Sequence, residues 1–310
     1  MKTHSSLESL PPGRRAIALG SFDGVHLGHR RVIERTIEAA AREGLTAAVV
    51  TFEPHPMAVL HPELAPLELS TPARKQQLVA ELGIDEMVQI RFDRAFSLLE
   101  HERFAQQVLA DGLGAKLVIV GRNFRYGHRA QGSIETLEVS GERLGFAVEP
   151  AALLEIGGAP VSSSRIRDLI TAGQVEQAGR LLGRPAWVEG TIVRGDGRGR
   201  ELGFATANVE PAPRTAVPAT GIYAGWGDLE GERHPAAISV GYNPTFSDAR
   251  ERVRIEAHLL DFDRDIYGRP LLIEFTHRLR GEERFGSIEE LVAQVHRDIA
   301  SVRTFAHTSG

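Results

Sequence analysis

The chain has 310 residues, of which 42% are hydrophobic and 25% charged, the composition of a globular protein that is long enough for two domains. Its formal net charge of −5 lacks the basic surplus typical of nucleic-acid binding, and the lack of cysteine excludes disulfides, thiolate metal sites and a cysteine nucleophile. No apolar run approaches the roughly 18 residues of a membrane span, and the first residues have no signal-peptide centre, so we expect a cytoplasmic protein with a frayed N-terminal tail.

The first half of the chain, up to about Leu182, alternates short apolar runs with helical periodicities. This alternation is typical of a parallel sheet covered by helices. The expected strands are residues 16–20, 45–52, 87–92 and 116–121, and the expected helices lie within residues 32–44, 71–83 and 101–114. The strands lack strict polar alternation because helices would cover both faces of the sheet.

From Trp187 onward the chain consists of short strand-like runs separated by Gly, Pro and Asp, as in a small antiparallel barrel or sandwich. The runs are residues 187–195, 221–231, 234–242, 252–262 and 270–280. A final helix is expected from an apolar stripe formed by Ile288, Leu291, Val292, Val295, Ile299 and Val302. A helical pattern ends at Gly183, before Pro185, and we therefore place the domains at residues 1–183 and 184–310.

The segment GSFDGVHLGH, residues 20–29, joins the first expected strand to the first helix. Parallel sheets bind ligands at the carboxyl ends of their strands, where helix N-termini attract anions. We therefore expect His26 and His29 to donate hydrogen bonds to phosphate oxygens. The other phosphate-binding residues expected in this segment are Gly20, Phe22, Gly24 and Gly28. Two other interpretations are a pair of polar surface histidines and a zinc pair, for which no further ligand pattern lies nearby.

Two later segments favour phosphate binding. SSSRIRDLI, residues 162–170, places hydroxyls at a helix start with Arg165 and Arg167 close behind, although such caps are also common as purely structural features. GRNFRYGHRAQG, residues 121–132, follows an apolar strand and has the glycines, aromatics and arginines of a binding loop. Neither a GxxxxGK[ST] loop nor a GxGxxG after the first strand is present.

The second half opens with a glycine- and arginine-rich loop whose backbone N–H groups could surround phosphates. Its candidate phosphate-binding glycines are Gly195, Gly197, Gly199 and Gly203. Thr206 and Asn208 follow as two neutral oxygen ligands, which suffice for Mg²⁺ because this ion takes few protein ligands besides waters and phosphates. The alternative is a turn capped by Thr and Asn.

The segment VRIEAHLLDF, residues 253–262, has the alternation of a half-buried strand. One face carries Val253, Ile255, Ala257 and Leu259, and the other carries Arg254, Glu256 and His258. Taken alone, a carboxylate on that polar face is usually solvated.

Together with TFEPHP at residues 51–56, these segments resemble, in order, the motifs of the bacterial bifunctional riboflavin kinase/FMN adenylyltransferase family, also called FAD synthetase. The resemblance covers nearly the whole chain, and several ordered motifs are far more specific than any one of them. It implies a Rossmann-like α/β nucleotidylyltransferase domain with a parallel sheet. A small antiparallel β-barrel of the riboflavin kinase type with a C-terminal helix would follow.

The resemblance implies that riboflavin and ATP give FMN in the barrel and that FMN and ATP give FAD and pyrophosphate in the first domain. The FMN phosphate is already a nucleophile, so His26, His29 and Arg167 would position groups and neutralise charge. The ribityl hydroxyl needs a base, and Glu256 matches the family's catalytic glutamate. The other implied residues are Ser162, Ser163 and Arg165 for ATP, Phe52, His55, Asn123, Phe124, Asn243 and Arg280 for flavin, and Thr206 and Asn208 for Mg²⁺.

Three positions depart from the family pattern. Asn123 replaces Asp and Ser164 replaces Thr, and both keep their hydrogen-bonding capacity. Ala205 replaces Pro, which loosens the loop by about 0.4 to 1 kcal/mol. Two other hypotheses stay open: a flavin or nucleotide sensor that turns over slowly, and an adenylyltransferase for another acceptor, such as pantetheine phosphate or a nicotinate nucleotide. The second hypothesis leaves the barrel without a role.

Overall fold

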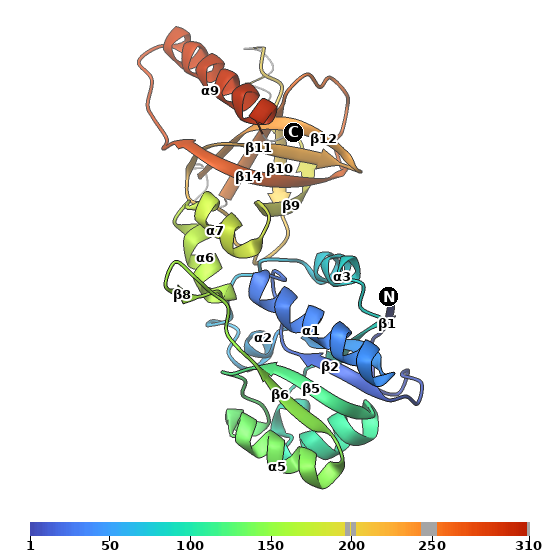
Figure 1. Ribbon diagram of the computed structural model, residues 1–310. Coiled ribbons are helices and arrows are strands. Elements are labelled where there is room, and N and C mark those ends of the chain that lie inside the picture. The colour runs from blue at the N-terminus through green and yellow to red at the C-terminus, as the bar shows by residue number, and fades with distance from the viewer. Residues whose placement is uncertain (196–198, 200–202, 243–252, 309–310) are drawn as a thin grey trace. The chain divides into compact units, whose positions relative to one another are not determined.

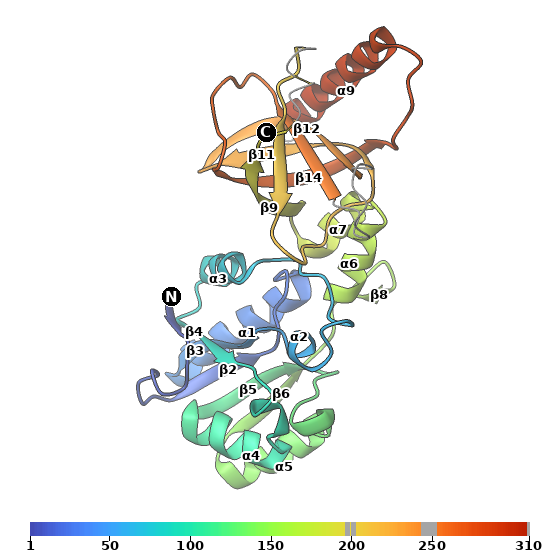
Figure 2. The ribbon, with the colours of Figure 1, turned by 180° about the vertical axis from the view of Figure 1, so that it is seen from behind.

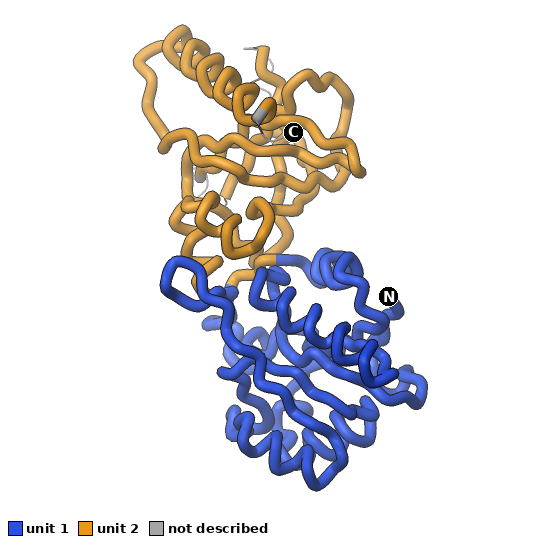
Figure 3. Tube along the Cα trace, viewed as in Figure 1, with its two compact units in different colours: residues 1–66, 70–163 blue, residues 67–69, 164–310 orange. Residues whose placement is uncertain are grey.

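The computed structural model describes residues 1–195, 199, 203–242 and 253–308. The chain divides into two compact units (Figure 3). Unit 1 comprises residues 1–66 and 70–163, and unit 2 comprises residues 67–69 and 164–310. Unit 1 is a parallel α/β fold and unit 2 an antiparallel barrel with a C-terminal helix, which confirms the expected fold classes.

The sheet of unit 1 is parallel throughout its described strands. Its strands are β1 (Lys2–His4), β2 (Arg15–Leu19), β3 (Thr46–Glu53), β4 (Glu86–Arg91), β5 (Ala115–Gly121) and β6 (Ala147–Ala151), in the spatial order β1-β4-β3-β2-β5-β6. The chain proceeds outward from β2 to β4 and then returns to the other side of β2 as β5. This reversal creates a topological switch point between β2 and β5, where sheets of this kind bind ligands at the carboxyl ends of the strands.

Helices cover both faces of this sheet, and every residue of β2 is buried as a result (Figures 1 and 2). The helical elements are α1 (Leu27–Glu43), α2 (Pro56–Leu60), α3 (Pro72–Glu81), the 3₁₀ turn η1 (Phe96–Leu98), α4 (His101–Arg103), the π-helix η2 (Phe104–Gly112), the 3₁₀ turn η3 (His128–Ala130) and α5 (Ile134–Leu144). Helix α1 packs against β2, β3 and β5. Residues of η2 and α5 enclose the core that contains Ile17 and Leu19. A short hairpin of β7 (Glu155–Ile156) and β8 (Ala159–Pro160) precedes the end of the unit.

All four expected strands of this half are confirmed as β2 to β5. The expectation of a frayed N-terminal tail was wrong, because Lys2–His4 pairs in parallel with β4 as strand β1. The backbone N–H of Lys2 donates to the carbonyl of Asp85 at 2.8 Å, so the edge of β4 is hydrogen-bonded. Strand β6 was not predicted. It contains Pro150, which an edge strand tolerates but which weakens the sequence signal.

Unit 2 begins within α6 (Ser163–Thr171), continues through α7 (Val175–Leu182) and then forms the barrel. The barrel strands are β9 (Ala186–Val193), β10 (Ala207–Pro211), β11 (Gly221–Leu229), β12 (Glu232–Tyr242), β13 (Val253–Leu259) and β14 (Pro270–Arg280), closed in the order β10-β13-β12-β11-β14-β9. Helix α9 (Ile288–Thr308) packs beside β11 and β12 (Figure 1). Alternate strand residues such as Val188, Ile255 and Phe275 fill the interior.

The five expected strands of the second half are all barrel strands, and strand β10 was missed because it is short and ends in Glu210 and Pro211. Most of the predicted stripe of α9 faces the protein, and Val302 is fully buried. The first residue of the stripe, Ile288, does not face the protein. It begins the helix and is 62% exposed. Over the described part of the chain, the structure has no helix that combines the length and apolar character of a membrane span.

Candidate functional sites

The turn between β2 and α1 contains two stacked imidazoles. The ring centroids of His26 and His29 are 3.6 Å apart, and the rings are inclined by 15°. His26 caps α1, since its Nδ1 accepts a hydrogen bond from the His29 backbone N–H at 3.2 Å. A ring nitrogen that accepts has no proton, so His26 is neutral and holds its proton on Nε2. His26 therefore offers a neutral N–H donor at Nε2, while His29 carries one ring N–H when neutral and two when protonated.

The backbone of this turn is strained. Phe22, Gly24 and Val25 all have left-handed backbones, with φ angles of 49°, 76° and 37°. Glycine adopts this conformation freely, whereas a β-branched residue such as Val25 does so only when its surroundings force it. The Phe22 ring is buried and packs edge-on against His29 with centroids 5.2 Å apart. Strain of this kind is concentrated at functional sites, which favours a binding role for the segment.

Asp23 holds the turn in place, and the sequence analysis missed it. Its side chain is only 6% exposed, and Oδ1 accepts from the backbone N–H and the hydroxyl of Ser70 at 3.2 and 3.3 Å. Ser70 Oγ in turn accepts from the Gly24 N–H at 3.1 Å. The Ser163 hydroxyl donates to the Asp23 carbonyl at 3.0 Å. An aspartate beside a glycine in a tight turn was the available signal, but its partner is 47 residues away.

Three of the predicted binding segments follow adjacent strands of the sheet, in the order β3, β2 and β5. At the end of β3, Phe52 belongs to an aromatic cluster, and the Nδ1 of His55 caps α2 by accepting from the Met57 N–H at 3.2 Å. After β5, Asn123 is exposed, and Phe124 stacks on Tyr126 with centroids 5.7 Å apart. Burial raises the pKa of the Tyr126 hydroxyl. These residues lie at the carboxyl edge of the sheet, as expected, while their contacts with a flavin stay predictions.

The remaining predicted residues of the first site lie directly after β2, in α1 and at α6. Gly20 directly follows β2, with its N–H donating to the Val50 carbonyl at 3.1 Å, and Gly28 lies in the first turn of α1. Ser162 precedes α6, and Ser163 is its first residue. Arg165 and Arg167 belong to unit 2, where Arg167 Nε donates to the Leu67 carbonyl at 2.5 Å. Their roles toward phosphate stay predictions.

On the barrel, a single row of residues crosses the outer face of five neighbouring strands. Glu256 of β13 lies directly opposite Asn208 of β10 on one side and Ser239 of β12 on the other. Ser239 lies opposite Ile222 of β11, and Ile222 lies opposite Arg280 of β14. The next residues along the strands, Val209, Ile255 and Val240, are buried in the barrel. We call Asn208, Glu256, Ser239, Ile222 and Arg280 the outer row.

A cavity of about 630 Å³ lies over four residues of the outer row, Ile222, Ser239, Glu256 and Arg280, and is bordered by α9. Its lining includes Thr206, Ile222, Ser239, Glu256, Arg280, Phe285, Leu291, Val292 and Val295. A second cavity of about 320 Å³ is lined in part by Gly195, Ala205, Thr206, Asn208 and Tyr267. Because Thr206 lines both, the two cavities adjoin there. The predicted base Glu256 thus lines the larger cavity, the predicted metal ligand Asn208 lines the smaller one, and Thr206 lies where the two cavities adjoin.

Arg254 joins the predicted base to a predicted metal ligand. Its guanidinium forms an ion pair with the Glu256 carboxylate, and its Nε donates to Asn208 Oδ1 at 3.2 Å. The alternation of β13 had placed Arg254 on the same face as Glu256, but nothing in the sequence identified it as a site residue. A side chain at Gly195 would overlap the Asn208 carboxamide, so this approach requires glycine.

The loop before β10 is held by a strand residue. The Ala205 carbonyl accepts a hydrogen bond from His258 Nδ1 at 2.8 Å. The ring of Phe204 packs edge-on against His258 and His296, with centroids 6.0 and 5.1 Å away. These contacts restrain the loop at the position where the family commonly has proline. Gly199 and Phe204 also line the larger cavity, and Gly203 has a left-handed φ of 87°.

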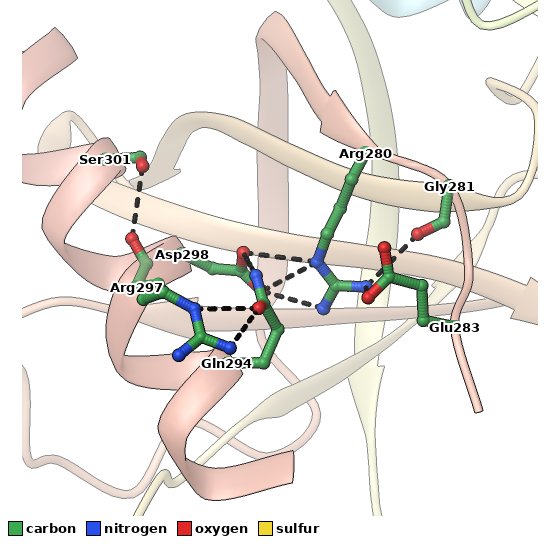
Figure 4. Close-up of polar contacts among 7 residues, drawn as sticks. All are labelled: Arg280, Gly281, Glu283, Gln294, Arg297, Asp298 and Ser301. Atoms are coloured by element: carbon green, nitrogen blue, oxygen red, sulfur yellow. Dashed lines mark hydrogen bonds and ion pairs between the residues drawn. The ribbon is translucent and has the colours of Figure 1, made fainter. Parts of the chain in front are cut away.

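Arg280 lines the larger cavity, but its charge is compensated within the barrel unit (Figure 4). Its Nε and Nη2 donate to the carboxylate of Asp298, at 3.2 and 2.8 Å, and Asp298 is only 6% exposed on α9. Gln294 Nε2 also donates to Asp298 Oδ1, at 2.9 Å. Arg280 therefore ties β14 to α9 beside the cavity. Two other predicted residues, Gly197 and Asn243, lie outside the described residues.

The chain resembles known proteins along its whole length. A family model described as FAD synthetase matches residues 10–165, and one described as riboflavin kinase matches residues 182–306. Proteins named bifunctional riboflavin kinase/FMN adenylyltransferase from Pseudomonas fluorescens and Bacillus subtilis are 36% and 37% identical, over 100% and 92% of this chain and 99% and 90% of theirs. A solved structure described as a macrolide-efflux protein from Streptococcus pneumoniae has a TM-score of 0.88 at 30% identity, covering 97% of this chain and 98% of that one.

Proposed function

The chain belongs to the family of bifunctional riboflavin kinase/FMN adenylyltransferases, and from this premise we propose which of its residues perform each reaction. It phosphorylates riboflavin with ATP to FMN, and it then transfers the adenylyl group of a second ATP to FMN to give FAD and pyrophosphate. The observation that supports our residue assignment is the outer row, in which Asn208 lies opposite Glu256 beside a largely apolar cavity.

In the kinase site, the larger cavity takes the flavin ring and the smaller one takes ATP. The apolar side chains of Phe285, Leu291 and Val295 suit a flavin, and the shared residue Thr206 places the two substrates side by side. Glu256 accepts the proton of the terminal ribityl hydroxyl while that oxygen bonds to the γ-phosphorus. The bond from the γ-phosphorus to the β-phosphate oxygen breaks, and ADP leaves.

We assign Mg²⁺ to Thr206 and Asn208. Their neutral oxygens suit a hard cation, and Asn208 Oδ1 already accepts from the cationic Arg254. Over the described ranges, no group of three or more His, Cys, Asp or Glu could hold a metal ion by itself, so ATP phosphate oxygens would complete the ligand set. When bound, Mg²⁺ neutralises phosphate charge.

In the adenylyltransferase site, an FMN phosphate oxygen bonds to the α-phosphorus of ATP, and the bond to the leaving pyrophosphate breaks. The neutral His26 donates from Nε2, whereas a protonated His29 neutralises charge on the phosphates. A division of labour between the imidazoles is favoured because two imidazolium rings stacked 3.6 Å apart would repel each other. The strained turn at the switch point of the sheet supports this location.

We also propose the domain boundary at residues 183 and 184, close to residue 182, where the riboflavin kinase model begins. The two compact units divide earlier, between residues 163 and 164, so α6 and α7 lie in the unit of the barrel. A cytoplasmic location is supported by the complete lack of cysteine, and the net charge of −5 argues against nucleic acid as a partner.

The test is incubation of the protein with riboflavin, ATP and Mg²⁺, followed by chromatography. We expect FMN first and FAD after it. If neither product forms, the chain is a flavin or nucleotide sensor. If a fragment ending at Gly183 uses FMN poorly and another phosphate well, the first domain has a different acceptor.

A further inference from the structure

The guanidinium of Arg254 contacts residues on both sides of the proposed phosphoryl transfer. It is ion-paired with Glu256, the proposed base, and it donates from Nε to Asn208 Oδ1, the proposed metal ligand, at 3.2 Å. A divalent cation bound by Asn208 would have to approach the same carboxamide oxygen that Arg254 contacts.

We propose that Arg254 competes with Mg²⁺ for the carboxamide oxygen of Asn208 and so sets the Mg²⁺ concentration that the kinase site requires. The inference rests on the proposed function of the barrel. In the absence of metal, Arg254 holds Asn208 and Glu256 together. When Mg²⁺ binds, the guanidinium leaves Asn208 and remains paired with Glu256.

Two physical arguments support competition over simultaneous binding. A guanidinium and a divalent cation on one carboxamide oxygen repel each other, because they are like charges within a few ångströms. The Arg254 side chain is 32% exposed and that of Glu256 is 26% exposed, so the guanidinium can move without leaving a buried charge unpaired. The ion pair with Glu256 does not involve Asn208, and it therefore persists after the metal binds.

Arg233 is an arginine of the barrel surface with which Arg254 can be compared. Arg233 on β12 makes a similar ion pair, with Glu274 of β14, but its guanidinium also lies over the Trp226 ring, at 4.2 Å from the centroid. Neither Arg233 nor Glu274 lines the two cavities of the site. Arg233 is therefore a matched control, since its removal breaks a comparable pair without affecting the proposed metal ligands.

The experiment measures ADP binding by calorimetry at a series of fixed free Mg²⁺ concentrations, which avoids turnover. The chains are the wild type, Arg254→Met, Arg254→Lys, Arg233→Met and Asn208→Ala. The component of binding that Asn208→Ala removes belongs to the barrel site. In Arg254→Met we expect the Mg²⁺ midpoint of this component to fall by about two- to fivefold, the size of a half-exposed charge interaction.

Arg254→Lys keeps the charge with a shorter reach, and its midpoint should fall less than that of Arg254→Met. If Arg254→Met does not fold, Arg254→Lys still tests whether the Mg²⁺ midpoint falls. Arg233→Met should match the wild type. An unchanged or higher midpoint in the Arg254 variants would overturn the inference while leaving the metal site intact. If Asn208→Ala removes no component, the metal assignment itself is wrong, and the competition is refuted with it.

Discussion

Asn208 and Glu256 lie directly opposite each other on the antiparallel strands β10 and β13. Residues paired in this way have Cβ atoms about 4.5 to 5.5 Å apart and share one face of the sheet. A metal-bound phosphate at Asn208 and a hydroxyl activated by Glu256 would therefore meet without any rearrangement of the strands. This pairing is the structural basis on which we propose the outer face of the barrel as the place of the kinase chemistry.

Replacing the proposed base should separate the two activities. We expect Glu256→Gln to lower FMN formation by about 100- to 10,000-fold, because the amide cannot accept the hydroxyl proton. Conversion of added FMN to FAD should stay near the wild-type rate. Glu274→Gln, which alters an arginine-paired glutamate away from the cavities, is the control and should affect neither rate. Equal loss of both activities in Glu256→Gln would show that the base has been misplaced.

The complementary change is His29→Ala. We expect the conversion of FMN to FAD to fall by about 100- to 1,000-fold, because a charged donor to the phosphates is lost. Riboflavin phosphorylation should be unaffected, since His29 belongs to unit 1 and the kinase residues belong to unit 2. Both rates can be followed by chromatography of the flavins. A parallel fall in FMN formation would contradict separate sites.

His26 has two roles that substitution can separate. His26→Ala should lose adenylyl transfer and about 0.5 to 2 kcal/mol of the free energy of unfolding, because the cap of α1 is removed. His26→Asn should keep that stability, since asparagine is a good N-cap, but should still lose adenylyl transfer with the Nε2–H. Denaturant unfolding and the FMN-to-FAD assay measure the two effects. Wild-type adenylyl transfer in His26→Asn would limit His26 to a structural role.

The Arg280–Asp298 pair should stabilise α9 over the flavin cavity. Asp298→Ala leaves the largely buried Arg280 without its main partner, so we expect a loss of about 3 kcal/mol in the free energy of unfolding and a raised KM for riboflavin. Arg303→Ala breaks the exposed Asp261–Arg303 pair, which also involves α9, and should destabilise the chain much less. Urea unfolding compares the two variants. Equal destabilisation of the two variants would refute the proposed role of the Arg280–Asp298 pair in holding α9 over the cavity.

The alternation of strand β13 was readable from the sequence, and it correctly placed Arg254 and Glu256 on the outer face of the barrel. What lies opposite Glu256 was not readable, because register depends on pairing with distant strands and β10 itself was missed. The contact between Arg254 and Asn208 spans 46 residues for the same reason. Local pattern thus determined which face of the strand carries Arg254 and Glu256, while the partners on that face depend on tertiary structure.

In unit 1, the position of HLGH between a strand and a helix was predictable, and so was its place at the carboxyl edge of the sheet. The neutral state of His26 was not, since it follows from the hydrogen bond between its Nδ1 and the His29 backbone. Asp23 was overlooked because the residue that it holds, Ser70, belongs to a later loop. The N-terminal strand β1 escaped prediction because its stability comes from the open edge of β4.

The central claim is that the chain contains two separate sites, and a mixing experiment tests it most directly. Glu256→Gln and His29→Ala are each supplied with riboflavin, ATP and Mg²⁺, alone and in an equimolar mixture, and FAD is measured. We expect no significant FAD from either variant alone and FAD from the mixture, because one protein makes FMN and the other adenylylates it. A mixture that yields no FAD, although His29→Ala releases FMN and Glu256→Gln converts added FMN, would contradict the account.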